Sequence, residues 1–168
     1  MLIKQRNKLF DLKVPRSLKL AYVWGKGLGL FANKTFKKGE TVIKFKADFL
    51  PCSNASPEAV QVSETHCLDT KWLVPEAFIN HSCSPSTTLD AEGYRYVAIK
   101  DISKNEEITF NYVTTEWDAG SEVFECHCGS KNCYKLVQGL KYLPKKEQDR
   151  LRPLLLPYLV RKLDRIKK

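Results

Sequence analysis

The stretch FINHSCSPST, residues 78–87, holds the densest group of reactive side chains in the sequence. It places the pair Asn80-His81 just ahead of Cys83, in a run whose Ser and Pro residues favour irregular backbone. Four roles are open for these residues: a nucleophile, a metal ligand, a cofactor contact or an ordinary turn. The choice among them depends on what the rest of the chain supplies.

Length and composition bound the class of protein. The chain has 168 residues, of which 43% are hydrophobic, and this predicts one compact domain with a terminal appendage. No apolar run approaches the roughly 18 residues of a membrane span, and residues 1–11 lack the apolar core of a secretory signal. We therefore expect no membrane contact and an intracellular location, cytoplasmic or chromatin-associated.

The net charge of +9 suggests an acidic partner surface. Basic residues are concentrated near the two ends, in KQRNK (residues 4–8) and RKLDRIKK (residues 161–168). The C-terminal run is typical of a solvated basic helix, and a nucleic-acid or chromatin contact is the alternative.

Short strands dominate the middle of the chain. LKLAYVWGKGLGLFA, residues 18–32, predicts two strands around a glycine turn, and further strands are expected at residues 41–45, 94–99 and 106–113. From residue 144 onward, apolar residues recur at helical spacing and two prolines interrupt them, so we expect one or two short helices docked by their apolar face. Those apolar positions are Leu151, Leu154, Leu155, Tyr158, Leu159 and Leu163.

Three of the six cysteines fall within eight residues. Cys126, Cys128 and Cys133 form a C-x-C-x4-C array, and such crowding in a reducing compartment favours a metal over disulfides. Zinc prefers four thiolate or imidazole ligands in a tetrahedron, so one corner is open. Cys83 fills it if the fold brings that residue to the array, and His127 is the weaker candidate.

Two further motifs are ambiguous when taken alone. The loop GKGLG, residues 25–29, lacks the following helix of a dinucleotide-binding loop, so it is either a tight hairpin or a place where the backbone closely approaches another group. The strand ITFNY places Phe110 and Tyr112 on one face. This pattern indicates core packing, a hydroxyl that orients a nucleophile, or an aromatic wall that holds an amine or cation.

Taken in order, KGLG, FINHSCSP, EITFNY and the C-x-C-x4-C array resemble a SET-domain protein lysine methyltransferase with a post-SET zinc motif, of the small kind that lacks a pre-SET domain. The resemblance covers roughly residues 18–140. It implies a mostly β fold of small sheets with short helices, in which a later strand threads the segment 80–83 as a pseudoknot. We accordingly divide the chain into an N-terminal segment (1–17), a SET domain (18–115), a post-SET zinc segment (116–140) and a basic helical tail (141–168).

The resemblance also implies an activity and its residues. A methyl group would pass from S-adenosylmethionine to a lysine of a protein substrate, such as a histone or another chromatin protein. Tyr112 would be the catalytic residue and would line the lysine channel with Phe110, which leads us to predict di- or trimethylation. The implied cofactor contacts are Lys26, Gly27, Leu28, Asn80, His81 and Tyr112, and the implied ligands of one structural zinc ion are Cys83, Cys126, Cys128 and Cys133.

Two rival functions use the same residues. Cys83 with His81 resembles the pair of a cysteine hydrolase, although catalytic Cys and His usually come from separate parts of a chain. A zinc-dependent binding module with a basic tail would perform no chemistry. Glu116, Asp118 and Glu122 follow Tyr112 closely, either as an acidic strip that receives a basic substrate or as solvated surface residues.

Overall fold

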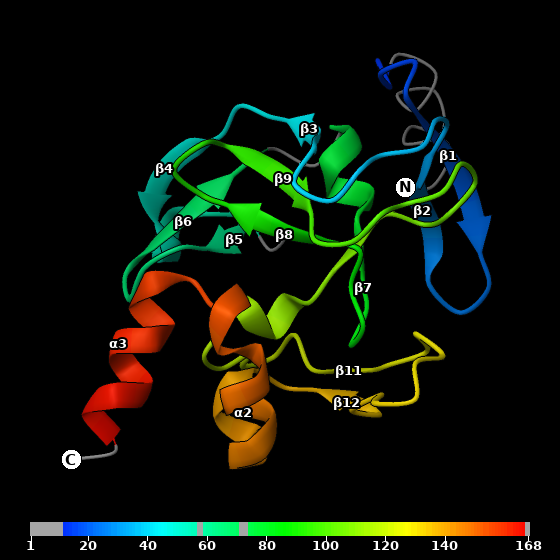
Figure 1. Ribbon diagram of the computed structural model, residues 1–168. Coiled ribbons are helices and arrows are strands. Elements are labelled where there is room, and N and C mark those ends of the chain that lie inside the picture. Colours follow the sequence, from blue (N-terminus) through cyan, green and yellow to red (C-terminus); the bar gives the residue numbers. More distant parts are fainter. Residues whose placement is uncertain (1–11, 57–58, 71–73, 167–168) are drawn as a thin grey trace.

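The computed structural model describes residues 12–56, 59–70 and 74–166, and the basic run at residues 4–8 lies outside them. Their strands form five small sheets, and helices lie toward the C-terminus (Figure 1). The mostly β fold class predicted from the sequence is confirmed. The strands are β1 (Leu18–Val23), β2 (Gly27–Ala32), β3 (Thr41–Lys44), β4 (Asp48–Pro51), β5 (Val60–Gln61), β6 (His66–Asp69), β7 (Asn80–His81), β8 (Thr87–Asp90), β9 (Arg95–Ala98), β10 (Thr109–Phe110), β11 (Phe124–Glu125) and β12 (Leu136–Val137).

The predicted glycine hairpin is confirmed. β1 and β2 pair antiparallel from Leu18 opposite Ala32 to Val23 opposite Gly27. Gly25 in the turn has a φ of 74°, a left-handed conformation that glycine adopts without strain. The hairpin lies on one side of the molecule, away from the C-terminal helices (Figure 1).

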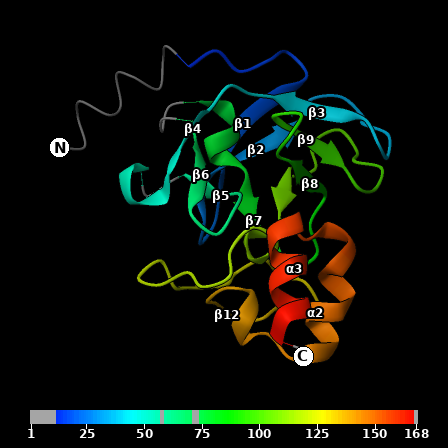
Figure 2. The ribbon, with the colours of Figure 1, turned by 90° about the vertical axis from the view of Figure 1, so that its left-hand side faces the viewer.

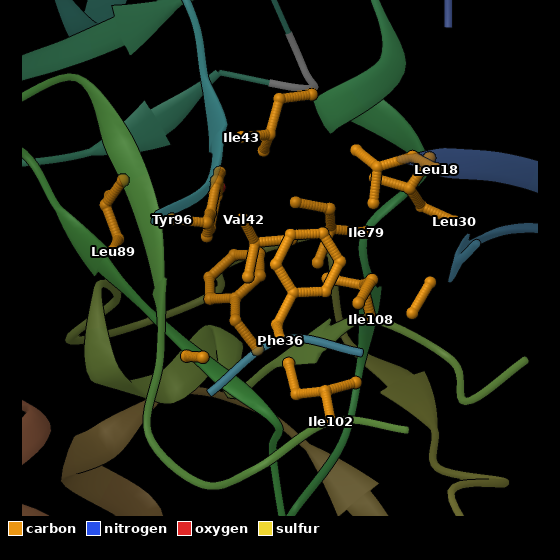
Figure 3. Packing of buried hydrophobic residues seen from close by; sticks show 13 residues of the cluster. Leu18, Leu30, Phe36, Val42, Ile43, Ile79, Leu89, Tyr96, Ile102 and Ile108 are labelled. Atoms are coloured by element: carbon orange, nitrogen blue, oxygen red, sulfur yellow. The ribbon is translucent and has the colours of Figure 1, made fainter. Parts of the chain in front are cut away.

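Two three-stranded antiparallel sheets form the centre of the molecule. Their strand orders are β3-β9-β8 and β4-β6-β5. Phe36, Tyr96, Ile102 and Ile108 are among the buried side chains that pack together beside the first of these sheets (Figure 3). We call this cluster the first core. Its buried members are Leu18, Leu30, Ala32, Phe36, Val42, Ile43, Ile79, Leu89, Tyr96, Ala98, Ile102, Ile108 and Phe110.

β7 and β10 are short but they join distant parts of the chain. They pair in parallel, with Asn80 opposite Thr109 and His81 opposite Phe110, and the Ser82 N–H donates to the Phe110 carbonyl at 3.0 Å. This pairing agrees with the threaded arrangement that the resemblance implied. It places the Asn-His pair beside the segment that leads to Tyr112.

The strand predicted at residues 106–113 is wrong in its extent. β10 ends at Phe110, and a 3-10 turn follows at Tyr112–Thr114 because the Asn111 side chain accepts a hydrogen bond from the Val113 N–H at 3.3 Å. Phe110 and Tyr112 therefore do not share a strand face. Their rings still meet, with centroids 4.7 Å apart.

The C-terminal helices are confirmed. α2 spans Lys145–Leu151, a 3-10 turn spans Arg152–Leu154 and α3 spans Pro157–Ile166. The two helices lie together beyond the sheets in both views (Figures 1 and 2). Their buried faces form a second core with two cysteines. The buried members of this second core are Cys83, Val113, Cys126, Val137, Leu140, Leu151, Leu155, Leu156, Tyr158, Leu159 and Leu163.

The remaining two cysteines pair with each other. Cys52 and Cys67 form a disulfide whose Cα atoms are 5.0 Å apart, and it joins the end of β4 to β6. The sequence did not predict this bond, because 15 residues separate the two positions and only the β4–β6 register brings them together. No helix within the described residues is long and apolar enough to cross a membrane.

Candidate active site

Four thiols converge between the end of β7 and the loop that joins β11 to β12. Cys83 follows β7, and Cys126, Cys128 and Cys133 lie in the loop between β11 and β12. All four sulfur atoms lie within 4.8 Å of one another, and the Sγ atoms of Cys83 and Cys126 are 3.8 Å apart. Tetrahedral zinc with Zn–S bonds of about 2.3 Å holds its sulfurs about 3.8 Å apart, so the donor set fits this metal. We call these residues the thiol cluster.

Gly129 makes the bend of the cysteine loop possible. Its φ of 69° is left-handed, and it directly follows Cys128. Burial raises the pKa of the Cys126 thiol to about 11 and also raises that of Cys83. A divalent cation is the counter-charge that allows several such thiols to be deprotonated together.

Hydrogen-bond donors surround the sulfur of Cys83. The Tyr134 N–H donates to it at 3.3 Å, and His81 Nε2 lies 3.2 Å away. The Tyr112 N–H donates to His81 Nδ1 at 3.2 Å, so the single proton of the neutral ring is on Nε2 and points at the sulfur. Burial, followed by the charge of Lys26, lowers the pKa of His81 to about 4 and keeps the ring neutral.

This geometry argues against the cysteine hydrolase. In that mechanism His81 must accept the thiol proton, whereas here Nε2 is the donor. Cys83 also has no exposed surface, so no substrate reaches its sulfur. His81 instead stabilises negative charge on the sulfur, as the outer hydrogen bonds of a metal site do.

A cavity of about 340 Å³ lies between the glycine hairpin, β7 and the cysteine loop, and we call it the histidine cavity. Its lining includes Lys26, Asn80, His81 and Tyr112, four of the six predicted cofactor contacts. The full lining is Gly25, Lys26, Asn80, His81, Tyr112, Phe124, Glu125, Cys126 and His127.

Gly27 and Leu28, the other two predicted cofactor contacts, do not line this cavity. The Leu28 carbonyl instead accepts a hydrogen bond from Asn80 Nδ2 at 3.2 Å. A Cβ atom at Gly29 would lie 2.9 Å from the same Asn80 nitrogen, so a larger residue there would displace that side chain. The hairpin thus approaches β7 closely, so the glycine loop serves both of the roles that the sequence left open.

Glu107 organises one wall of the histidine cavity. Its Oε2 accepts from Lys26 Nζ at 2.6 Å, and its Oε1 accepts from Asn80 Nδ2 at 2.9 Å. The sequence analysis missed this residue. In the sequence, Glu107 is marked only by its position just before the strand that reaches Phe110. No local pattern distinguishes it from the neighbouring Glu106 as a site residue.

A second cavity of about 270 Å³ also has Tyr112 in its lining, and we call it the aromatic cavity. Phe110 lines it, as predicted for a lysine channel, and Tyr112 and Phe124 line both cavities. The full lining is Phe45, Ala59, Val60, Leu68, Thr70, Glu76, Ala77, Ile79, Leu89, Tyr96, Phe110, Tyr112, Thr115, Glu116, Glu122 and Phe124.

Tyr112 is held between the two cavities. Its hydroxyl donates to the Ile79 carbonyl at 3.0 Å, and its ring packs against His81 with centroids 5.3 Å apart. Burial, followed by the negative charges of Glu116 and Glu107, raises the pKa of the phenol. The hydroxyl therefore stays protonated and acts as a hydrogen-bonding group, not as a base.

The structure separates the two candidates for the open zinc corner. Cys83 joins the thiol cluster, whereas His127 lies outside it, with its ring 6.4 Å from the exposed ring of Trp24. His127 lines the histidine cavity instead, as does Phe124. Neither was predicted there, because the β11–β12 loop and the hairpin meet only in the folded chain.

Comparisons with known proteins establish the family. The sequence model of the SET domain matches residues 27–113, just over half of the chain. The protein therefore belongs to the SET-domain family. The match includes β7, β10 and Tyr112, and it ends before the three cysteines of the loop.

Curated relatives match in sequence. Methyltransferase flvH of Aspergillus flavus is 42% identical over 74 residues, which are 43% of this chain and 41% of the relative. Histone-lysine N-methyltransferase ASHH3 of Arabidopsis thaliana is 25% identical over 163 residues, 85% of this chain and 44% of that protein. The H3 lysine-36 specific histone-lysine N-methyltransferase of Candida albicans is 38% identical over 154 residues, 80% of this chain and 18% of that protein. The chain thus spans less than half the length of each of these relatives.

Solved structures match in fold. The crystal structure of KRYPTONITE in complex with mCHG DNA and SAH has a TM-score of 0.59 at 22% identity, over 71% of this chain and 28% of that one. A second KRYPTONITE structure, with mCHH DNA, an H3(1-15) peptide and SAH, has a TM-score of 0.58.

Proposed function

We propose that this protein is a protein-lysine N-methyltransferase that uses S-adenosylmethionine. The observation that carries the proposal is the position of Tyr112, which lines both the histidine cavity and the aromatic cavity. A methyl transfer needs a donor and an acceptor that enter from different sides and meet at one point in line. Two cavities that share one tyrosine support a site of this kind.

The histidine cavity is the cofactor site in this proposal. S-adenosylmethionine supplies a methyl group on a positively charged sulfonium. Asn80 and His81 line the part of the cavity that would receive its adenosine, and Lys26, held by Glu107, offers a cation to its carboxylate. KRYPTONITE, which is similar in fold, was solved with SAH, and this supports the same class of ligand.

The aromatic cavity receives the lysine side chain. Phe45, Tyr96 and Phe110 provide apolar walls for its hydrocarbon part, and aromatic faces attract an ammonium group. Tyr112 orients the neutral amine through its protonated hydroxyl. Because Phe110 carries no hydroxyl that would hold a space-filling water, we expect the products to include di- or trimethyl-lysine.

The thiol cluster holds one structural zinc ion in this proposal. Its four sulfurs provide a closed set of ligands, which is typical of structural zinc. Cys83 is two residues from His81, and Cys126 lines the histidine cavity itself. The metal would therefore fix the walls of the cofactor site, and Cys126, Cys128 and Cys133 would form the post-SET motif that the sequence predicts.

The substrate is a protein segment that contains a lysine. The relatives named for histone-lysine methylation and the KRYPTONITE complex with an H3 peptide support a histone or another chromatin protein, and hence a chromatin-associated location. A nucleic-acid contact has weaker support. Within the described part of the tail, Arg165 pairs with Glu64 at 2.8 Å and Arg152 pairs with Asp164 at 2.8 Å, so part of its charge is already neutralised.

Substitution of Tyr112 tests this function. Tyr112→Phe removes one hydroxyl, so we expect cofactor affinity to stay the same while methyl transfer falls by about a hundred-fold or more. Transfer of a radiolabelled methyl group to histones and cell lysate measures the rate, and calorimetry measures the affinity. Tyr142→Phe is the matched control, because that tyrosine is half exposed and lines neither of the two cavities. Near wild-type transfer by Tyr112→Phe would exclude it as the catalytic residue.

A zinc-dependent binding module is the alternative function. It accounts for the thiol cluster but not for the paired cavities. Wild-type, zinc-loaded protein that binds no S-adenosylmethionine would favour it over the methyltransferase.

A further inference from the structure

The aromatic cavity carries negative charge on a chain that is strongly positive overall. Glu76, Glu116 and Glu122 line it, and its described lining holds no lysine, arginine or histidine. The net charge of the chain is +9, so a local excess of carboxylates is not expected from the composition alone. Aromatic packing alone does not require acids in this cavity.

Glu116 is fixed by its backbone relative to Tyr112. Its N–H donates to the Tyr112 carbonyl at 3.2 Å, and its own carbonyl accepts from the Leu140 N–H at 2.9 Å. The residue is therefore anchored from both sides at the end of the 3-10 turn. Its side chain lines the same cavity as the Tyr112 ring.

The carboxylate of Glu116 lacks the partners that its neighbours have. Asp118 pairs with Lys141, and Glu122 accepts a hydrogen bond from Ser121 Oγ at 3.1 Å. No hydrogen bond or ion pair from the described residues reaches the Glu116 carboxylate. A half-buried carboxylate that has no partner among the described residues and belongs to the lining of a cavity is available to a cationic ligand.

The titratable groups around Glu116 are acidic or neutral. Glu122 and Glu76 line the same cavity, together with Tyr96 and Tyr112. Burial, followed by the charge of Glu116, raises the pKa of the Tyr158 phenol. Burial, followed by the negative charge of Glu122, raises the pKa of Glu116 to about 7. A carboxylate in such surroundings is stabilised when it takes up a proton or pairs with a cation.

We propose that Glu116 accepts the proton of the substrate ammonium inside the aromatic cavity, directly or through one water. This inference rests on the proposed methyltransferase function. The lysine ammonium gives one proton to the carboxylate, which yields a neutral amine and a neutral carboxylic acid. The amine lone pair then forms the new N–C bond as the sulfonium C–S bond breaks, and the bonding pair of that bond goes to sulfur.

The raised pKa of Glu116 makes this proton transfer less unfavourable than it would be to an ordinary glutamate. A free lysine has a pKa of about 10.4, about six units above an ordinary glutamate. The pKa of Glu116 closes about half of that gap, and the sulfonium charge and the dry channel lower the pKa of the amine further. Tyr112 cannot serve instead, because its phenol stays protonated.

Glu116→Gln in the full, zinc-loaded chain tests the proposal. For wild type, kcat/KM rises with pH through about 7 and then levels off, because Glu116 must be ionised in the free enzyme. The variant has no such base, so its kcat/KM falls by about ten-fold or more at pH 7.5 and climbs steadily toward the pKa of the free amine. Asp118→Asn is the matched control and keeps the wild-type profile, since Asp118 is an exposed acid on the same segment that lines neither the aromatic cavity nor the histidine cavity.

A less basic substrate sharpens the test. A peptide in which aminoethylcysteine replaces the target lysine has a more acidic ammonium, because the sulfur in its side chain withdraws electrons. The deficit of Glu116→Gln should shrink with this peptide. An equal deficit with both peptides, or a wild-type pH profile in the variant, would overturn the proposal.

Two further outcomes are decisive. If wild type binds no cofactor or transfers no methyl group, the methyltransferase function itself fails, and this proposal fails with it. If Glu116→Gln misfolds and therefore loses cofactor binding, the pH dependence of kcat/KM for the wild-type protein tests the proposal instead. A kcat/KM that climbs with constant slope to about pH 9, with no levelling above about pH 7, contradicts a base at Glu116.

Discussion

The two cores of the protein differ in what holds them together. The first core consists of aliphatic and aromatic side chains contributed mainly by the sheets, whereas the second packs the leucines of α2 and α3 around two members of the thiol cluster. A hydrocarbon core is stable once it is packed, but buried thiols that ionise need a cation. The β domain and the C-terminal part therefore depend on different chemistry, although residues of both line the histidine cavity.

The segment around β7 connects the two cores. Ile79 is buried in the first and Cys83 in the second, and the Asn-His pair of the histidine cavity lies between them. A disturbance of the thiol cluster should therefore reach the histidine cavity along four residues of backbone.

The largest expected effect follows from Cys83→Ser. Loss of one of four ligands should remove most of the zinc, and structural zinc contributes on the order of 10 kcal/mol in small zinc-binding domains. Hydrogen exchange should then rise throughout residues 116–166 and stay low in β1–β3. Metal analysis and exchange measured by mass spectrometry check this. Cys67→Ser is the control for zinc content, since it breaks the disulfide with Cys52 but leaves the four thiols of the cluster intact. Unchanged zinc content in Cys83→Ser would contradict the assignment.

Buried leucines in the two cores give the next largest effects. Leu30 and Leu159 are both fully buried, one in each core, so replacing either with alanine should cost about 2–5 kcal/mol. Leu159→Ala should loosen only the C-terminal part, whereas Leu30→Ala should lower the free energy of unfolding of the whole chain. Denaturant titration with exchange mapping separates the two. Equal loss of protection in β1–β3 for both variants would show that the cores unfold as one unit.

Removal of the Lys26 amine should have a smaller and more local effect. Lys26→Ala deletes one partner of the half-buried pair with Glu107 and lets Asn80 change its orientation. We expect about ten-fold weaker binding of S-adenosylmethionine, or about 1.4 kcal/mol, with little change in stability. Calorimetry and a melting curve measure the two quantities. Lys19→Ala on the same hairpin is the control, because its amine reaches only the exposed Asn105.

The smallest effect is expected at the surface of α3. Arg165 and Glu64 form an exposed pair at 2.8 Å, and such pairs contribute at most about 1 kcal/mol. Arg165→Ala should change neither zinc content nor cofactor affinity. A loss of affinity for chromatin or DNA in this variant, with methyl transfer to a free peptide unchanged, would assign the tail a binding role.

Sequence reasoning succeeded where the determining contacts are local. The hairpin at residues 18–32 and the C-terminal helices follow from spacing of glycines, prolines and leucines, and the cysteine array by itself indicates a metal. The pairing of β7 with β10 followed only from the resemblance to a family, because two residues on each side carry no recognisable pattern of their own.

Sequence reasoning failed where the fold brings distant residues together. Glu107 reaches Lys26 across 81 positions, and the disulfide between Cys52 and Cys67 depends on the β4–β6 register. Glu116 and Asp118 are two residues apart and look alike in the sequence, yet one lines a cavity and the other pairs with Lys141 at the surface. Only the tertiary structure separates them.

Titration of S-adenosylmethionine into zinc-loaded and chelator-treated protein tests the central claim most directly. That claim is that the thiol cluster and the histidine cavity form one site joined through residues 80–83. The account predicts one cofactor bound per chain by the loaded protein, and at least about ten-fold weaker binding after the metal is removed, restored when zinc is added back. No binding by the loaded protein, or the same affinity with and without zinc, would contradict it.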